Sequence, residues 1–439
     1  MNRWKELYAE RLGGMEETIC SLPKKATVIM SMAAMEGQGF MSSIHTYSEH
    51  FSSLTVVSCL NMKSYEFCEN PEYQGKFMNQ NWFFGPSNRK AAANGYKLVE
   101  YMPNNLHQAG SQKIAQLRED GETVIFWGTT TPMDERTGFF NLGLSNVYEM
   151  EIALQADRVI CEVNEKVPYM EGDHQLHIRN VDAVVEFNAD LPEIPLLEPA
   201  ELETRIAEHI APLVPDASTL QIGIGGIPNA VAKLMQDKKD LGIHTEMFTE
   251  SMIDLFERGA VTNMRKSLWK GKTICTFALG SKRMYKWVER NPGILLLRGS
   301  YVNDPFVIAQ NDSMISINTA ISIDLTGQVS SESIGPRQFS GTGGQLDTHR
   351  GAANSRNGKG IIALRSTAKK GTISTIVSML PVGSAVTVPR QDLDWVATEY
   401  GTARLWGRSV SERARLLIGL AHPDFKDELT YQARKLGYL

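Results

Sequence analysis

The segment from Gln221 to Gly259 constrains the fold of this chain more than any other stretch. Apolar residues alternate up to Ile224 as in a β-strand, and the glycines Gly223, Gly225 and Gly226 interrupt the alternation. Pro228 then opens a run with apolar residues at helical spacing, which are Ala230, Val231, Leu234 and Met235. Because proline lacks an N–H, it fits a first helical turn. The order strand, glycine turn and helix start predicts backbone N–H groups that face an anion.

A second strand and helix follow within the same segment. Residues 243–248 (IHTEMF) are typical of a short strand, and residues 251–258 of a helix that ends at Gly259. Glu246 is therefore expected near a strand end, where α/β proteins bind ligands. Glu250 is expected in the first turn of the helix, where a negative charge stabilises the helix dipole.

The rest of the chain indicates two α/β halves. Short apolar runs such as 123–127 and 157–161 alternate with helical patterns, which favours largely parallel sheets. Residues 181–185 are typical of a last strand, and the proline-containing stretch that follows is typical of a linker. We therefore expect an N-terminal domain over 1–190, a linker over 191–200 and a C-terminal domain over 201–439 that carries Glu246.

Composition narrows the class of protein. The chain has 439 residues, 42% of them hydrophobic, and a net charge of −5, which argues against nucleic acid as the main partner. The N-terminus is charged and no apolar run approaches ~20 residues, so neither a signal peptide nor a membrane span is expected. The five cysteines are scattered without a CxxC pair, which is typical of reduced thiols in a cytoplasmic protein.

Several motifs in fixed order carry a family resemblance. Besides GIGGIPNAV and IHTEMF, the chain contains FFGPSNRKAAANGYKLVEYMP, EVNEKVPYMEGDHQLHIRNVD, SINTAISIDLTGQV, SGTGGQLD, ALRSTAKKGTISTIV and ATEYGTARLWGRSVSERARLLIGLAHPDF. With these the chain resembles the acetyl-CoA hydrolase/transferase family over nearly its whole length, and within it the 4-hydroxybutyrate and butyrate CoA-transferases. The resemblance implies the CoA-transferase fold, with two similar α/β domains, and acyl-CoA and short-chain carboxylates as substrates.

The resemblance also implies the site residues. Glu246 matches the nucleophile of the family's TE motif, a role that fits the chemistry, because a carboxylate can hold an acyl group at the energy of a thioester. Two glycine segments match CoA-contacting or oxyanion-binding loops, and Lys369 matches a lysine near CoA; the loop residues are Gly223, Ile224, Gly225, Gly226, Ile227, Gly343 and Gly344. Gln345 could hydrogen-bond the substrate or brace its loop, and Glu36 matches a loop that would face the site.

The implied chemistry uses CoA as a substrate, with no permanently bound cofactor. A metal site is not expected, because the HxxH pair of His174 and His177 has no acidic or cysteine partner to complete a zinc set. A homodimer or a higher homo-oligomer is expected.

Three alternatives remain at this stage. An acyl-CoA hydrolase would use the same intermediate with water as the acceptor. A non-catalytic CoA-binding or scaffold protein would have no use for Glu246. A dinucleotide-binding oxidoreductase is disfavoured, because GIGGIP has Pro228 where the GxGxxG fingerprint requires glycine or alanine.

Overall fold

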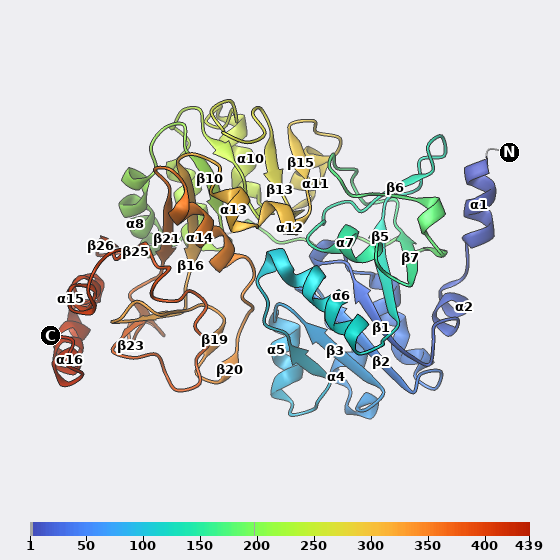
Figure 1. Ribbon diagram of the computed structural model, residues 1–439, viewed down its shortest axis with the longest axis horizontal. Helices are drawn as coiled ribbons and strands as arrows, with labels where there is room; N and C mark the ends of the chain where they lie inside the picture. The colour runs from blue at the N-terminus through green and yellow to red at the C-terminus, as the bar shows by residue number, and fades with distance from the viewer. Residues whose placement is uncertain (1–2, 197) are drawn as a thin grey trace. The chain divides into compact units, whose positions relative to one another are not determined.

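The computed structural model describes residues 3–196 and 198–439, which form two compact units. The first unit runs to Ile194 and includes Cys275–Tyr301, and the second comprises Pro195–Ile274 and Val302–Leu439. In Figure 1 the first unit is mainly blue to green and the second runs from green to red.

The first unit is built on a seven-stranded parallel sheet in the order β4-β3-β2-β1-β5-β7-β9. Its strands are β1 (Lys25–Met30), β2 (Ser53–Ser58), β3 (Phe77–Asn81), β4 (Val99–Tyr101), β5 (Val124–Thr130), β7 (Arg158–Val163) and β9 (Ala183–Glu186). The strands β6 (Phe139–Asn141) and β8 (Gln175–His177) form an antiparallel pair. The helices of this unit are α1 (Arg3–Arg11), α2 (Met15–Cys20), α3 (Gln38–Ser43), α4 (Glu66–Glu69), α5 (Pro86–Ala93), α6 (Ala109–Glu119), α7 (Glu149–Ala153) and α11 (Lys282–Val288).

Burial on both faces explains why the central strands of this sheet are continuously apolar. All seven residues of β5 are buried, as are the last five of β1. Parallel strands connected by crossover helices are covered on both sides and need such runs. Val28, Leu54, Ile125 and Trp127 belong to one core cluster that spans the sheet.

The second unit has a six-stranded sheet in the order β11-β10-β16-β21-β25-β26. Only the last pair of neighbouring strands is antiparallel. The strands are β10 (Thr219–Ile222), β11 (Gly242–Ile243), β16 (Met314–Thr319), β21 (Lys359–Ala363), β25 (Trp395–Thr398) and β26 (Gly401–Arg404). The helices are α8 (Glu201–Ile210), α9 (Gly226–Leu234), α10 (Glu250–Glu257), α13 (Pro305–Ile308), α14 (Gln345–Asn354), α15 (Val410–Leu420) and α16 (Pro423–Lys435).

Short strands follow the main ones in the second unit. They are β12 (Met247–Phe248), β17 (Ser322–Asp324), β18 (Val329–Ser330), β19 (Ser333–Ile334), β20 (Arg337–Gln338), β22 (Thr367–Ala368), β23 (Ile373–Ser374) and β24 (Ile376–Val377). β13 (Thr273–Cys275) and α12 (Gly299–Val302) lie where the chain passes between the units. The expected α/β class with mainly parallel sheets is confirmed in both units.

The segment Cys275–Tyr301 returns to the first unit after an excursion of 80 residues into the second. It carries β14 (Phe277–Ala278), α11 and β15 (Ile294–Leu296). The Ile194 N–H donates to the Gly280 carbonyl at 3.0 Å, and the Leu296 N–H to the Glu171 carbonyl at 2.8 Å. The Tyr285 hydroxyl donates to the Pro192 carbonyl. The segment is therefore fixed to the first unit by its backbone at several points.

The segment 221–259 forms the predicted elements with two differences. β10 ends at Ile222, so Ile224 lies in the loop, where it is 47% exposed. The predicted strand 243–248 is split, because the His244 N–H donates to Leu220 of β10 whereas the Thr245 N–H donates to Ile274. The chain thus leaves β10 just before Glu246. Helix α10 and its left-handed Gly259 (φ 77°) are as predicted.

No helix in the described part of the chain is long and apolar enough to cross a membrane.

Candidate active site

Glu246 and the two predicted glycine loops of the second unit lie at one edge of its sheet. Because β11, β10 and β16 are parallel, their carboxyl ends share that edge. Gly223 follows β10 directly, and Glu246 lies three residues after β11. The Gln345 side-chain amide donates to the carbonyl of Thr319, the last residue of β16, at 2.7 Å. The loop that precedes α14 therefore reaches the same edge, where α/β folds bind ligands.

Glu246 is held by two donors. The Asn303 side-chain amide donates to Glu246 Oε2 at 2.8 Å, and the Gly344 N–H also donates to this carboxylate. Asn303 is fully buried, and its Oδ1 is buried without a partner. A Cβ placed on Gly344 would overlap both Glu246 Oε2 and Asn303 Nδ2. A side chain at position 344 would therefore displace the Glu246 carboxylate or the Asn303 amide.

The surroundings of Glu246 favour its protonated form. Burial, together with a smaller contribution from the neighbouring carboxylate of Asp347, raises the pKa of Glu246 to about 7. The hydrogen bonds from Asn303 and Gly344 oppose these effects and stabilise the charged form. Both the protonated and the ionised form of Glu246 are therefore populated near neutral pH, and the ionised form is less strongly solvated than a surface glutamate.

A buried polar network fixes α14, and with it Gly344, against the sheet. Asn318 Nδ2 donates to the hydroxyls of Thr348 and Ser316, each at 3.0 Å. The Ser316 hydroxyl in turn donates to Gln221 Oε1. Since all four side chains are buried, this network ties α14 to β16 and β10.

The first glycine loop, residues 223–227, exposes its backbone and the apolar side chain of Ile224 to solvent. Gly225 is the N-cap of α9 with φ 113°, a conformation that side chains rarely adopt. The carboxylate of Glu203 lies so close to Gly226 that a Cβ there would overlap it. The exposed loop at a helix N-terminus has the geometry that anion-binding loops use.

Lys369 lies at an exposed hairpin tip between β22 and β23, not in the cluster around Glu246. Lys369, Lys370 and Gly371 have φ of 47°, 58° and 87°, so three successive residues are left-handed. For lysine this conformation costs of order 1–2 kcal/mol. Glu250 is the first residue of α10, as predicted, and is buried.

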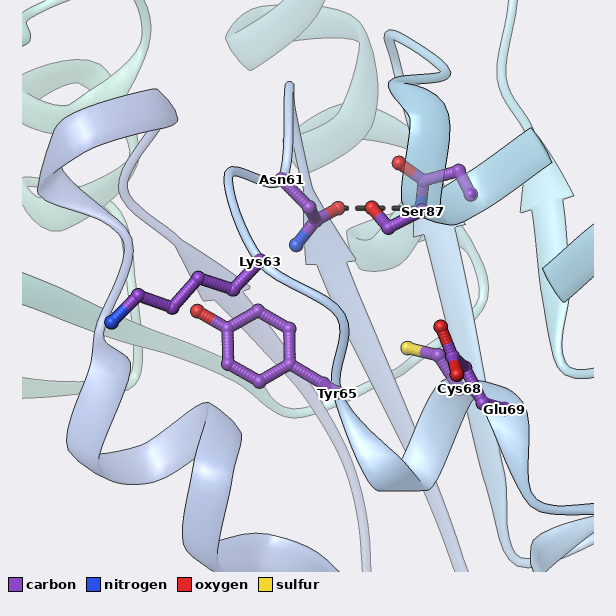
Figure 2. Close-up of a pocket in the computed structure, with 7 residues that line it drawn as sticks. Asn61, Lys63, Tyr65, Cys68, Glu69 and Ser87 are labelled. Carbon is purple, nitrogen blue, oxygen red and sulfur yellow. Dashed lines mark hydrogen bonds between the residues drawn. The ribbon is translucent and has the colours of Figure 1, made fainter. Parts of the chain in front are cut away.

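The first unit contains a polar pocket next to Glu36 (Figure 2). Its lining residues are Asn61, Lys63, Tyr65, Cys68, Glu69, Ser87 and Asn88. Glu36 is buried beside it and accepts a hydrogen bond from the Met62 N–H, and burial raises the pKa of Glu36 to about 7. Figure 2 shows the Tyr65 ring between Lys63 and the Cys68–Glu69 side of the pocket. The lining presents an ammonium, two amides, two hydroxyls, a thiol and a carboxylate around a space of about one water molecule.

The HxxH histidines serve the fold of the first unit. His174 is buried with Nε2 3.1 Å from the Gly143 carbonyl, and His177 Nδ1 accepts the Arg179 N–H. Among the described residues no group of three or more His, Cys, Asp or Glu side chains is arranged to hold a metal ion.

Two residues of the cluster were missed by the sequence analysis, Asn303 and Asp347. Asn303 is 57 positions from Glu246 and lies between two short helices, α12 and α13, in a stretch without a recognisable pattern. Asp347 is the last residue of the SGTGGQLD motif, so the motif could have predicted its place near Gly344.

Comparison with known proteins covers almost the whole chain. Residues 2–195 match the family model of the acetyl-CoA hydrolase/transferase N-terminal domain, and residues 280–433 match that of the C-terminal domain. A 4-hydroxybutyrate coenzyme A transferase of Clostridium kluyveri is 37% identical over 433 residues, 98% of this chain and 99% of that protein. A succinyl-CoA:cyclohexane-1-carboxylate CoA transferase of Geobacter metallireducens is 43% identical over 81% of this chain and 80% of its own length. The crystal structure of RipA from Yersinia pestis has a TM-score of 0.92 at 38% identity, covering 99% of this chain and all of that one.

Proposed function

Since the chain belongs to the acetyl-CoA hydrolase/transferase family and is an enzyme that transfers CoA, we propose that Glu246 is its nucleophile and that CoA is transferred through a glutamyl-CoA thioester. The observation that carries this proposal is the pair of donors on the Glu246 carboxylate: the Asn303 amide donates to Oε2, and the Gly344 N–H donates to the same carboxylate. Since the Asn303 amide holds Oε2, the proposed attacking oxygen is Oε1.

The first half-reaction has two steps. Oε1 attacks the acyl-CoA carbonyl, the C–S bond breaks, and a glutamyl–acyl anhydride and CoA thiolate form. The thiolate then attacks Cδ of Glu246, and the Cδ–Oε1 bond breaks to release the first carboxylate. In the second attack, negative charge develops on Oε2, the atom to which Asn303 donates, and the Gly344 N–H donates to the same carboxylate. Such preorganised donors typically contribute ~10²–10³ in rate each.

The second half-reaction reverses these steps with another acid. Its carboxylate attacks the glutamyl-CoA carbonyl and displaces CoA thiolate, which attacks the acyl carbonyl of the new anhydride. The product acyl-CoA forms and Glu246 is regenerated as a carboxylate. Because the acids bind in turn, the kinetics are ping-pong.

The glycine loops are the proposed contacts for CoA. In this proposal the residues Gly223–Ile227, at the start of α9, offer N–H groups to the polar parts of CoA and the exposed Ile224 to its apolar parts. Lys369, at the left-handed hairpin tip, is proposed to contact a CoA phosphate, a contact that would compensate the conformational cost of the turn.

For the acids we propose butyrate or 4-hydroxybutyrate together with acetate. The support is the 4-hydroxybutyrate coenzyme A transferase among the relatives. Acids that differ by one methylene are separated by only ~1–3 kcal/mol, so a panel of acyl-CoA donors and carboxylate acceptors decides the pair. We further propose a cytoplasmic homodimer or higher homo-oligomer.

Trapping of the intermediate tests the mechanism. Wild-type protein is incubated with acyl-CoA and no acceptor, digested, and analysed by mass spectrometry. CoA mass is expected on the peptide that contains Glu246, and Glu246→Gln should lack both the adduct and activity. Glu246→Asp should also lose most activity, because displacing the attacking oxygen by ~1 Å can cost ~10²-fold.

Glu208→Gln is the matched control, since Glu208 is an exposed glutamate on α8 of the same unit. It should form the adduct and turn over like wild type. The mechanism is wrong if Glu246→Gln transfers CoA at a rate comparable with wild type. A hydrolase would instead consume acyl-CoA at the same rate with and without acetate.

A further inference from the structure

His244 ties together the two chain segments that carry Glu246 and Asn303. It lies two residues before Glu246, and its Nε2 is 2.8 Å from the carbonyl of Val302, the residue before Asn303. Asn303 Nδ2 in turn contacts Glu246 Oε2 at 2.8 Å. The two segments are thus joined at two points, once through the imidazole and once through the carboxylate.

The hydrogen bonds of the ring select one neutral tautomer. A carbonyl oxygen only accepts, so Nε2 carries the proton that is donated to Val302. Nδ1 lies 3.3 Å from Asn311 Nδ2 and accepts from it. The orientation of the Asn311 amide is fixed because its Oδ1 accepts the Leu268 N–H. Both ring nitrogens are therefore satisfied in the neutral Nε2–H form.

The surroundings keep the ring neutral and immobile. His244 is 1% exposed, and burial together with the nearby ammonium of Lys266 lowers the pKa of His244 to about 3. Lys266 is also buried, and its Nζ donates to the carbonyls of Ile243 and Lys272 at 2.7 Å each. The residue before His244 is therefore fixed as well. The ring has no part in proton transfer at physiological pH.

We infer that His244 is a positioning residue, which sets the place of the Asn303 amide against Glu246 Oε2 by holding the Val302 carbonyl. The inference rests on the proposed role of Glu246. As a consequence, the effect of His244 on the rate depends on Asn303. Once the Asn303 amide is absent, the exact position of residue 303 no longer affects the rate. A residue that only stabilised the fold would have the same effect whether or not that amide were present.

The test compares His244→Gln with His244→Asn, because each places its amide nitrogen near a different ring atom. The amide nitrogen of Gln lies near the place of Nε2 and can donate to Val302, whereas that of Asn lies nearer Nδ1 and cannot. We expect His244→Asn to lower kcat by about 10–100-fold with little change in KM for acyl-CoA, since misplacement by ~1 Å costs ~10²-fold. His244→Gln should retain most of the rate.

The second arm combines each variant with Asn303→Ala. If His244 acts through Asn303, His244→Asn should change kcat by less than about 3-fold in the Asn303→Ala background. Thermal melts of all variants report folding. If His244→Asn does not fold, Asn311→Ala, which removes the donor to Nδ1, replaces it and should show the same non-additivity with a smaller effect.

The inference is wrong if the rate losses of His244→Asn and Asn303→Ala multiply in the double variant. It is also wrong if His244→Gln and His244→Asn lose the same rate. Activity of Glu246→Gln is measured alongside. If that variant is active, the proposed nucleophile is wrong and the role of His244 falls with it. If Glu246→Gln is inactive and the rate losses still multiply in the His244→Asn, Asn303→Ala double variant, only the role of His244 is refuted.

Discussion

Replacing Glu246 with Gln should make the protein more stable at neutral pH as well as inactive. The folded-state pKa of Glu246 is about 7, against 4.5 for an unperturbed glutamate. A raised pKa means that the folded state binds the proton more tightly than the unfolded state between these two values. The wild-type protein therefore loses stability as pH rises from about 4.5 through 7, and the Gln variant does not.

The size of this loss follows from the two pKa values. A difference of about 2.5 pH units corresponds to about 3 kcal/mol at ~1.36 kcal/mol per unit. Glu246 keeps some contact with solvent, so we expect about 2 kcal/mol in practice. For a unit of this size, that corresponds to an increase of about 4–8 °C in the Tm of the second unit.

Calorimetric melts of wild type and Glu246→Gln between pH 4.5 and 8.5 measure the effect. The two Tm values should be close at pH 4.5 and diverge up to about pH 8, with the variant higher. Glu208→Gln, at an exposed site, should follow wild type throughout. Parallel Tm curves for wild type and Glu246→Gln would refute the reasoning, because they would show that the Glu246 carboxyl titrates normally in the folded protein.

Two further predictions concern the same cluster. The kcat/KM for acyl-CoA should fall tenfold per pH unit below about pH 7, because only ionised Glu246 attacks. Asp347→Asn should move this acid limb of the pH–rate profile to lower pH, because it removes the neighbouring negative charge. The pH–rate profiles of the two proteins test this, and an acid limb at the same pH in both would contradict it. Gly344→Ala should lower kcat by at least ~10²-fold, because its Cβ overlaps Glu246 Oε2 and Asn303 Nδ2. Gly419→Ala on α15 is the control and should leave steady-state rates unchanged, because a Cβ there meets nothing within 4 Å.

Local pattern was sufficient to predict much of the second unit. The glycine turn before α9 and the helix α10 with its Gly259 cap both appear in the structure, because each depends on residues within one or two turns. The family motifs identified Glu246 and Gly344, and the structure brings these two together.

Contacts between distant residues could not be predicted in this way. Asn303 reaches Glu246 only because the chain returns to the sheet edge after 57 residues. The break in the strand at Thr245 depends on the partner Ile274, which no local pattern reveals. Nor does any local signal show that Cys275–Tyr301 packs with residues before Ile194.

The return of Cys275–Tyr301 to the first unit bears on how the protein is made. During synthesis, the chain up to Ile194 leaves the ribosome about 80 residues before the segment that completes its unit, at ~5–20 residues per second. The groups that this segment contacts, such as the Glu171 carbonyl and the Ile194 N–H, lack these intramolecular partners for several seconds. The first unit is thus completed only after Glu246 has been translated. Expression of residues 1–194 alone yields a first unit that lacks Cys275–Tyr301.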